Sequence, residues 1–147
     1  MEKIKFLKGT VEMDYTRSPG KVTGKFLTEL RDNQTIQGIR CGNCSHVFVP
    51  PQLYCPDCRI KMQSFVKLHN QGTIEYFTKV FEKMPFARWE APYAFIAVRL
   101  AGAHTLLWHR MINIDNIKAG MKVKAVFKPR ETREGSILDI DYFEAGE

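Results

Sequence analysis

Four cysteines are the residues of this chain best suited to chemistry, and they come in two pairs. Two residues separate Cys41 from Cys44, two separate Cys55 from Cys58, and ten lie between the pairs. Each C-x2-C pair places two thiolates on a tight turn, so one tetrahedral ion can close both turns. Four thiolates suit Zn²⁺ in a closed structural site that holds the fold and performs no catalysis. The pattern predicts a zinc ribbon in which Cys41, Cys44, Cys55 and Cys58 bind one structural Zn²⁺ ion.

Other uses of the cysteines fit the sequence less well. Two disulfides would need an oxidising compartment, and residues 1–8 contain no apolar run of the kind that directs secretion. A thioredoxin-like C-x-x-C motif would use one pair and leave the other idle. Iron stays open as an alternative ion, because Cys55-Pro-Asp-Cys58 resembles a rubredoxin knuckle, although the ten-residue spacer is shorter than in that electron carrier.

The cysteine segment is too small to fold by burying apolar side chains alone. A stretch of about 25 residues cannot bury enough apolar surface to offset its chain entropy. Structural zinc contributes about 10–16 kcal/mol at neutral pH, so we expect metal binding and folding of the ribbon to be one event.

The composition is that of a soluble globular chain with one domain or two small ones. The chain has 147 residues, of which 44% are hydrophobic and 26% charged. No apolar stretch approaches the roughly 20 residues of a membrane span. Free thiols and the lack of a targeting sequence predict a cytoplasmic location. The net charge of +6 permits an anionic partner, but it is dispersed along the chain, as on an ordinary solvated surface.

Three sections follow one another along the chain. Residues 1–38 form a polar leader with a short amphipathic helix, in which Phe26 and Leu30 share one face. Residues 39–62 are the zinc ribbon, and residues 63–147 are rich in β-strand patterns. The leader has too few apolar residues for a core of its own. Its helix is therefore expected to pack either on the rest of this chain or on a partner subunit.

Five short strands are predicted in the last section from period-two alternation and regularly spaced turn residues. A longer polar connection, which could hold a helical turn, separates the third strand from the fourth. These features are typical of the OB-fold, a five-stranded Greek-key barrel. We therefore expect a mainly β protein with a short helical leader, a rubredoxin-like zinc ribbon and a C-terminal five-stranded OB-fold barrel. The predicted strands span residues 73–81, 92–100, 104–111, 121–128 and 136–143.

Alternation along the first two barrel strands predicts a face that mixes aromatic and basic side chains. Phe77, Lys79 and Phe81 of the first strand would share it with Phe95 and Arg99 of the second. Such a face could stack bases and hold phosphates, contact a protein partner, or simply close an end of the barrel. The sequence leaves these three interpretations open.

The loop between the first two barrel strands carries large residues at its tip. Phe86, Arg88 and Trp89 are expected there, and apolar residues exposed in a loop suggest contact with a ligand or partner. Trp89 could instead fold back onto the ribbon as a lid. On the third strand, His104 and His109 are expected on opposite faces, and no Ser, Cys or carboxylate is spaced for a catalytic set. We predict no catalytic residue in this chain.

Several short stretches of the ribbon and barrel match a known family pattern. They are Gly38-Ile-Arg-Cys41, Val49-Pro-Pro51, Tyr54-Cys-Pro56, Pro92-Tyr-Ala94 and Ile117-x-x-Gly120-x-x-Val123. In this respect the chain resembles the DUF35 family, whose members join a rubredoxin-like zinc ribbon to an OB-fold. The resemblance covers about residues 20–143. The glycine expected after each cysteine pair is replaced by Ser45 and Arg59, which affects the knuckles but not the ligands.

The resemblance implies a function. Such proteins are small accessory subunits of thiolase-type or hydroxymethylglutaryl-CoA-synthase-type enzymes that handle acyl-CoA thioesters, or partners of hydratases that degrade sterol side chains or aromatic compounds. It implies that a thiolase-like subunit supplies the catalytic residues and binds most of the CoA, while this chain docks on it in a hetero-oligomer and helps to enclose CoA. The leader helix would be the docking helix. The expected contacts with the partner or CoA are Phe26, Leu30, Phe77, Lys79, Arg88, Trp89 and Arg99.

A nucleic-acid-binding module is the alternative function. Zinc ribbons and OB barrels both occur in proteins that bind RNA or DNA, and an isoelectric point near 9.2 permits it. This alternative predicts salt-sensitive binding to single strands, weakened by Phe77→Ala or Lys79→Ala.

Overall fold

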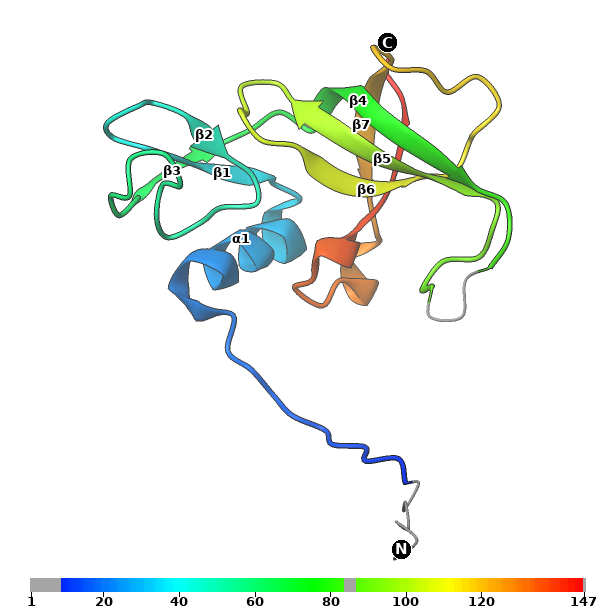
Figure 1. The fold of residues 1–147 in the computed structure, drawn as a ribbon, viewed down its shortest axis with the longest axis horizontal. Helices are drawn as coiled ribbons and strands as arrows, with labels where there is room; N and C mark the ends of the chain where they lie inside the picture. Colours follow the sequence, from blue (N-terminus) through cyan, green and yellow to red (C-terminus); the bar gives the residue numbers. More distant parts are fainter. Residues whose placement is uncertain (1–8, 84–86, 147) are drawn as a thin grey trace, which may run out of the picture.

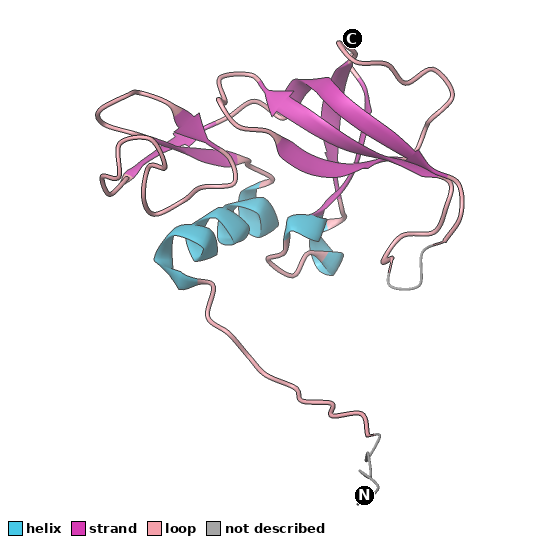
Figure 2. Ribbon diagram, in the orientation of Figure 1, coloured by secondary structure: helices cyan, strands magenta, loops and turns pink. Residues whose placement is uncertain are grey.

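One α-helix, a small sheet, a barrel and two short 3-10 helices (Arg130–Thr132 and Ile137–Asp139) are the regular elements in the part of the chain that the structure describes. The computed structural model describes residues 9–83 and 87–146. Figure 1 shows the small sheet and the barrel side by side, with the helix α1 (Gly20–Asn33) lying along both. Figure 2 shows that strands predominate. The expected fold class, mainly β with a helical leader, a ribbon and a barrel, is confirmed.

The small sheet carries the ribbon. It contains the antiparallel strands β1 (Gln37–Arg40), β2 (Val47–Phe48) and β3 (Ser64–Lys67), in the order β2-β1-β3. Ile39 pairs with Phe48 of β2 and with Phe65 of β3. The first cysteine pair therefore lies in the turn between β1 and β2, and the second lies in the connection from β2 to β3.

Five strands close the barrel in the order β4-β5-β6-β8-β7. All neighbouring pairs are antiparallel except β6 and β8, and β4 returns to pair with β7. This is the connectivity expected of an OB-fold, in which the third and fifth strands run parallel. The strands are β4 (Gln71–Val80), β5 (Tyr93–Leu100), β6 (Leu107–Met111), β7 (Lys122–Phe127) and β8 (Ile140–Ala145).

Two of the predicted barrel elements differ in detail. The connection after β6 contains turns and no helix within residues 112–121. The last strand begins four residues later than expected, because Ile137–Asp139 form a 3-10 turn. Asp139 is buried there, and its carboxylate accepts hydrogen bonds from the backbone N–H groups of Glu134, Gly135 and Ser136. These bonds stabilise a turn at positions where the sequence pattern predicts a strand.

A bulge in β4 overturns the predicted aromatic and basic face. The pairing with β5 shifts between Ile74 and Tyr76, so that Phe77 lies opposite Ile96 and Lys79 lies opposite Ala94. Residues directly opposite one another share a face, and Ile96 and Ala94 belong to the barrel core. Phe77 and Lys79 therefore lie on the other side of the sheet from Phe95 and Arg99. The extra residue Glu75 reverses the alternation, as bulges do.

One hydrophobic core joins the leader helix, the ribbon and the barrel. Phe26 and Leu30 of α1 are 2% and 0% exposed, and they pack in the same cluster as Val47 of the ribbon and Ile74 of the barrel. The helix thus packs on this chain, which is one of the two outcomes expected. This burial corrects the expectation that Phe26 and Leu30 contact a partner, because neither side chain reaches the surface.

Side-chain hydrogen bonds reinforce the junction between ribbon and barrel. The N–H of Val47 donates to Nδ1 of His104 at 3.1 Å. The hydroxyl of Thr105 accepts from the N–H of Val49 at 2.7 Å and donates to the carbonyl of the same residue at 2.8 Å. The ribbon hairpin is therefore fixed to the loop between β5 and β6. Among the described residues, no helix combines the length and apolar character needed to cross a membrane.

Candidate metal centre and the surface around Trp89

The four cysteines lie on two similar backbone turns. In the first, the N–H of Cys41 donates to the carbonyl of His46, and the N–H of Ser45 donates to the carbonyl of Cys41. In the second, Cys55 and Arg59 repeat this arrangement, with Ile60 as the acceptor of the Cys55 N–H. Ser45 and Arg59 have φ angles of 62° and 59°, a region that glycine usually occupies. The knuckle geometry is thus kept without the glycines.

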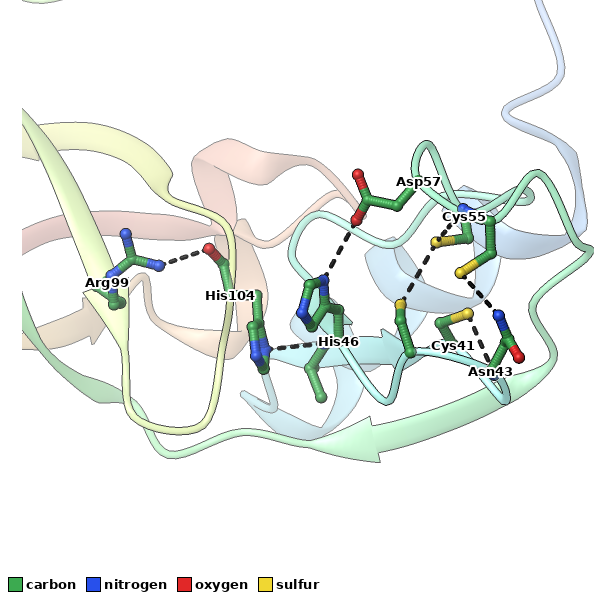
Figure 3. Close-up of polar contacts among 10 residues, drawn as sticks. Cys41, Asn43, His46, Cys55, Asp57, Arg99 and His104 are labelled. Carbon is green, nitrogen blue, oxygen red and sulfur yellow. Dashed lines mark hydrogen bonds and ion pairs between the residues drawn. The ribbon is translucent and has the colours of Figure 1, made fainter.

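The sulfur atoms are placed for a tetrahedral ion. The four Sγ atoms all lie within 4.8 Å of one another, and those of Cys44 and Cys55 are 3.8 Å apart (Figure 3). A tetrahedron with Zn–S bonds of about 2.3 Å has edges of about 3.8 Å. The predicted ligands therefore fit Zn²⁺, and no position is left open for a substrate.

Hydrogen bonds to sulfur surround the site. The backbone N–H of Asn43 donates to Sγ of Cys41, and the backbone N–H of Cys58 donates to Sγ of Cys55, both at 3.4 Å. The side-chain amide of Asn43 donates to Sγ of Cys58 at 3.2 Å, which links the two knuckles. Such donors stabilise negative charge on metal-bound sulfur and orient the ligands.

The thiols of the first knuckle have pKa values shifted in opposite directions. The backbone N–H of Cys44 lowers the pKa of Cys41 to about 7. The backbone of His46 acts to lower the pKa of Cys44, but burial and the three neighbouring sulfurs raise it to about 12. A divalent cation removes this conflict because its charge stabilises all the thiolates together.

A histidine beside the metal site belongs to the junction instead. Nδ1 of His46 lies 3.2 Å from a carboxylate oxygen of Asp57, and its ring stacks on that of His104 at 4.2 Å (Figure 3). The side chains of His46 and Asp57, together with Cys44, form a second group of possible metal ligands. The four-cysteine set already completes a tetrahedron, so His46 is better explained as a link between the second knuckle and the barrel.

The remaining predicted contact residues do not form one surface. The guanidinium of Arg99 binds both carboxylate oxygens of Glu75 and the carbonyl of His104, so it is already engaged within the chain. The pairing with Arg99 also lowers the pKa of Glu75. Phe77 is exposed and Lys79 half-buried, on the opposite side of the sheet from Arg99. Phe86 lies outside the described residues.

Trp89 covers one end of the barrel and not the ribbon. Its ring meets that of Tyr93 edge-on at 5.5 Å and lies 5.5 Å from the ring of His109. The guanidinium of Arg110 lies over it, 5.4 Å from the ring centre. Arg88 is exposed beside it.

Two hollows flank Trp89. One, of about 330 Å³, is lined mainly by apolar side chains, including Val80, Tyr93 and Phe95. The other, of about 240 Å³, is bordered by the three cations Arg88, Arg110 and Lys128 together with Asp141. Sequence reasoning missed Arg110 and Lys128. They come from parts of the chain that only the closed barrel brings next to the Trp89 loop.

Because His109 is buried, we expect the protein to lose stability in weak acid. Its side chain is 1% exposed inside the barrel, and among the described residues neither ring nitrogen has a hydrogen-bond partner. Burial lowers the pKa of His109 from its ordinary 6.5 to about 4. Between these values the unfolded chain binds a proton that the folded chain does not, so the free energy of unfolding falls as the pH drops. The expected loss is about 2 kcal/mol between about pH 7 and about pH 5.

Urea unfolding of the wild type and of His109→Leu at both pH values measures this contribution. The substitution removes the titrating group, so the variant should lose less stability than the wild type over the same pH interval. Zinc content is checked at each pH, since protonated thiols release the ion. An equal loss in both proteins would contradict the assignment to His109.

The geometry defines a class of protein: a zinc ribbon with four cysteine ligands that packs against an OB-type barrel. Comparison with known proteins is consistent with this class. Residues 29–61 match the family model described as the rubredoxin-like zinc ribbon domain of ChsH2. A DUF35 domain-containing scaffold protein of Methanocaldococcus jannaschii is 28% identical over 122 residues, which cover 77% of this chain and 82% of the relative. A protein of the same description from Methanothermobacter thermautotrophicus is 28% identical over 116 residues, covering 73% and 83%.

Solved structures share the fold. A DUF35-family protein of unknown function from Sulfolobus solfataricus superposes with a TM-score of 0.61 at 23% identity, covering 73% of this chain and 78% of that one. A chain of the Ltp2–ChsH2(DUF35) aldolase superposes with a TM-score of 0.60 at 22% identity, covering 80% and 92%. Together these matches confirm the predicted resemblance to the DUF35 family.

Proposed function

We propose that this chain is a non-catalytic, zinc-binding scaffold subunit of a thiolase-like enzyme complex that acts on an acyl-CoA. The observation that carries the proposal is its alignment, over most of both chains, with two relatives described as scaffold proteins. The structure described as the Ltp2–ChsH2(DUF35) aldolase adds support, because a chain of this fold occurs there together with an enzyme.

The metal site agrees with a scaffolding role. All four positions of a tetrahedral ion are taken by Cys41, Cys44, Cys55 and Cys58, so the ion would have no free position at which to bind a substrate. Its contribution would be to fold the ribbon. The catalytic cysteine and histidines would come from the partner, in a hetero-oligomer.

The surface around Trp89 supports contact with CoA. CoA combines phosphates with an aromatic base, and Arg88, Arg110 and Lys128 border a hollow next to the indole ring. Arg88 and Lys128 would attract the phosphates, because Arg110 is already paired with Asp141, while Trp89 offers an aromatic face on which the base can stack. Arg99 is less suited to this role than expected, because Glu75 already neutralises it.

Affinity purification of the tagged chain from its own cells tests the proposal. We expect a thiolase-like subunit to be recovered in stoichiometric amount and identified by mass spectrometry. The recovered complex should turn over acyl-CoA, and the separated partner should lose activity until this chain is added back. A partner with full turnover alone would contradict the proposal, and nuclease-sensitive material in its place would favour nucleic-acid binding.

The same complex tests the CoA contact. Removing the charge of Lys128 by Lys128→Ala should raise KM for acyl-CoA several-fold and leave kcat unchanged, because ground-state binding is lost. Lys124→Ala is the matched control, since it removes an equal charge from an exposed position of β7 outside the hollow. Equal effects of the two substitutions would argue against a specific CoA site at Trp89.

A further inference from the structure

The segment before the helix carries three large apolar side chains in the open. Val11, Met13 and Tyr15 are 83%, 77% and 85% exposed. The segment forms neither helix nor strand between residues 9 and 19, and Figure 1 shows it running away from the ribbon and barrel. Among the described residues, none forms a backbone hydrogen bond with residues 9–17. Its backbone donors and acceptors are therefore available for pairing.

The order of residues in this segment is that of a β-strand with one apolar face. From residue 10 to residue 16, apolar and polar positions alternate without exception, in the order Thr-Val-Glu-Met-Asp-Tyr-Thr. In an extended chain, alternate side chains point to opposite sides, so Val11, Met13 and Tyr15 would form one continuous stripe. A stripe of this kind is stable when the extended chain pairs with a sheet and buries it.

The chain itself offers no suitable edge for this strand within the part that the structure describes. The barrel is closed, but β4 pairs with β7 only through Gln71–Thr73, so its second half has one free edge. Figure 1 shows that edge on the side of the barrel away from the start of α1, and only residues 17–19 link the segment to the helix. The ribbon sheet has two free edges, but β2 (Val47–Phe48) has two residues and β3 (Ser64–Lys67) has four. A seven-residue strand would extend beyond either edge. Its pairing surface must therefore come from another protein.

Charge indicates what that surface carries. Within residues 10–16 the charged residues are Glu12 and Asp14, both on the polar face, and Arg17 follows the alternating stretch. This acidic segment belongs to a chain whose net charge is +6. A sheet edge with basic side chains would complement it, whereas a second copy of the segment would place like charges together.

We propose that residues 10–16 form a β-strand that pairs with the exposed sheet edge of a partner protein. Val11, Met13 and Tyr15 fill apolar pockets on that protein, and Glu12 and Asp14 face its basic residues. Backbone hydrogen bonds supply affinity in strand addition, and the alternate side chains supply specificity. The strand is tethered to a fixed point, because α1 is held in the core by its buried face. The identity of the partner as a thiolase-like subunit rests on the proposed function, but the pairing does not.

Hydrogen exchange of the full chain with its partner tests the pairing directly. The probe is the protein that co-purifies with the tagged chain, separated and then mixed back. In the free chain, the amides of residues 10–16 should exchange without protection. In the complex, every second amide should slow by at least tenfold, because an added strand bonds along one side only. Unchanged exchange of the whole segment in a saturated complex would overturn the proposal.

Two pairs of variants test the same point by affinity. Met13→Pro or Asp14→Pro, at whichever of the two positions is protected in the complex, removes a bonded backbone donor and should weaken binding at least tenfold, whereas Met13→Leu keeps the donor and an apolar side chain. Tyr15→Ser should weaken binding at least tenfold, whereas Thr16→Ala on the polar face should have little effect. All four should melt at the wild-type temperature, since the segment lies outside the core.

The outcomes separate this inference from the proposed function. Equal affinity of all four variants for a thiolase-like partner would contradict the proposed strand pairing but would leave the scaffold role supported. Tenfold losses with a partner of another enzyme class would support the strand and overturn the scaffold role. A free chain that is dimeric by light scattering, and becomes monomeric with the proline variant, would overturn pairing with another protein and indicate a second copy.

Discussion

Serine in place of Cys41 or Cys58 is expected to abolish metal binding and unfold the ribbon. The four sulfurs form one tetrahedral set, and a single hydroxyl replaces a charged ligand with a neutral one. Since structural zinc contributes about 10–16 kcal/mol, most of the stability of the ribbon should be lost with the ion. Metal analysis of the purified proteins should find zinc in equal molar amount in the wild type and none in either variant.

His46→Ala is the matched control for these variants. It removes a side chain that is able to bind a metal from the first knuckle without removing a cysteine, and should leave the zinc content unchanged. Stoichiometric zinc in Cys41→Ser would contradict the four-cysteine site. Loss of zinc from His46→Ala would instead assign a ligand to the group of Cys44, His46 and Asp57. A red wild-type protein would indicate iron, whereas the zinc form is colourless.

Phe26→Ala should be the most destabilising substitution in the leader. The side chain is 2% exposed and packs where helix, ribbon and barrel meet. Removing a buried phenylalanine loses its transfer free energy and leaves a cavity, at about 3–5 kcal/mol. Urea unfolding of the isolated chain should show this loss, while Thr28→Ala on the exposed side of the same helix should change stability by less than about 0.5 kcal/mol.

The same substitution distinguishes a core helix from a docking helix. If Phe26 supported only a partner interface, the isolated Phe26→Ala chain would unfold at the wild-type urea concentration. Its defect would then appear only in the affinity for the partner. A loss of stability in the isolated chain is what the buried position predicts.

The parts of the fold that sequence predicted well depend on local patterns. The ligand set follows from the cysteine spacing, and the sulfur positions fit it without rearrangement. The barrel strands follow from alternation, and four of the five predicted ranges enclose or closely overlap the observed strand. The exception begins late at Ile140, because hydrogen bonds to the buried carboxylate of Asp139 hold a turn where the pattern predicted a strand.

The parts that sequence missed depend on contacts between distant segments. Alternation cannot show that Glu75 is an extra residue, since the bulge exists only relative to the register of β5. The amphipathic face of the leader indicated burial but not what covers it, and the face packs into the core cluster that also contains Val47 and Ile74. The stripe of Val11, Met13 and Tyr15 was visible in the sequence, but only their exposure gives it significance.

The junction between ribbon and barrel limits how such proteins can change over generations. Val47 and Val49 belong to the ribbon by position, yet their backbone groups bind His104 and Thr105 of the barrel, and their side chains fill its core. Grafting a foreign ribbon onto this barrel would break those bonds even if all four cysteines were retained. We expect the hairpin and the loop to be inherited as a unit, with substitutions in one accompanied by substitutions in the other.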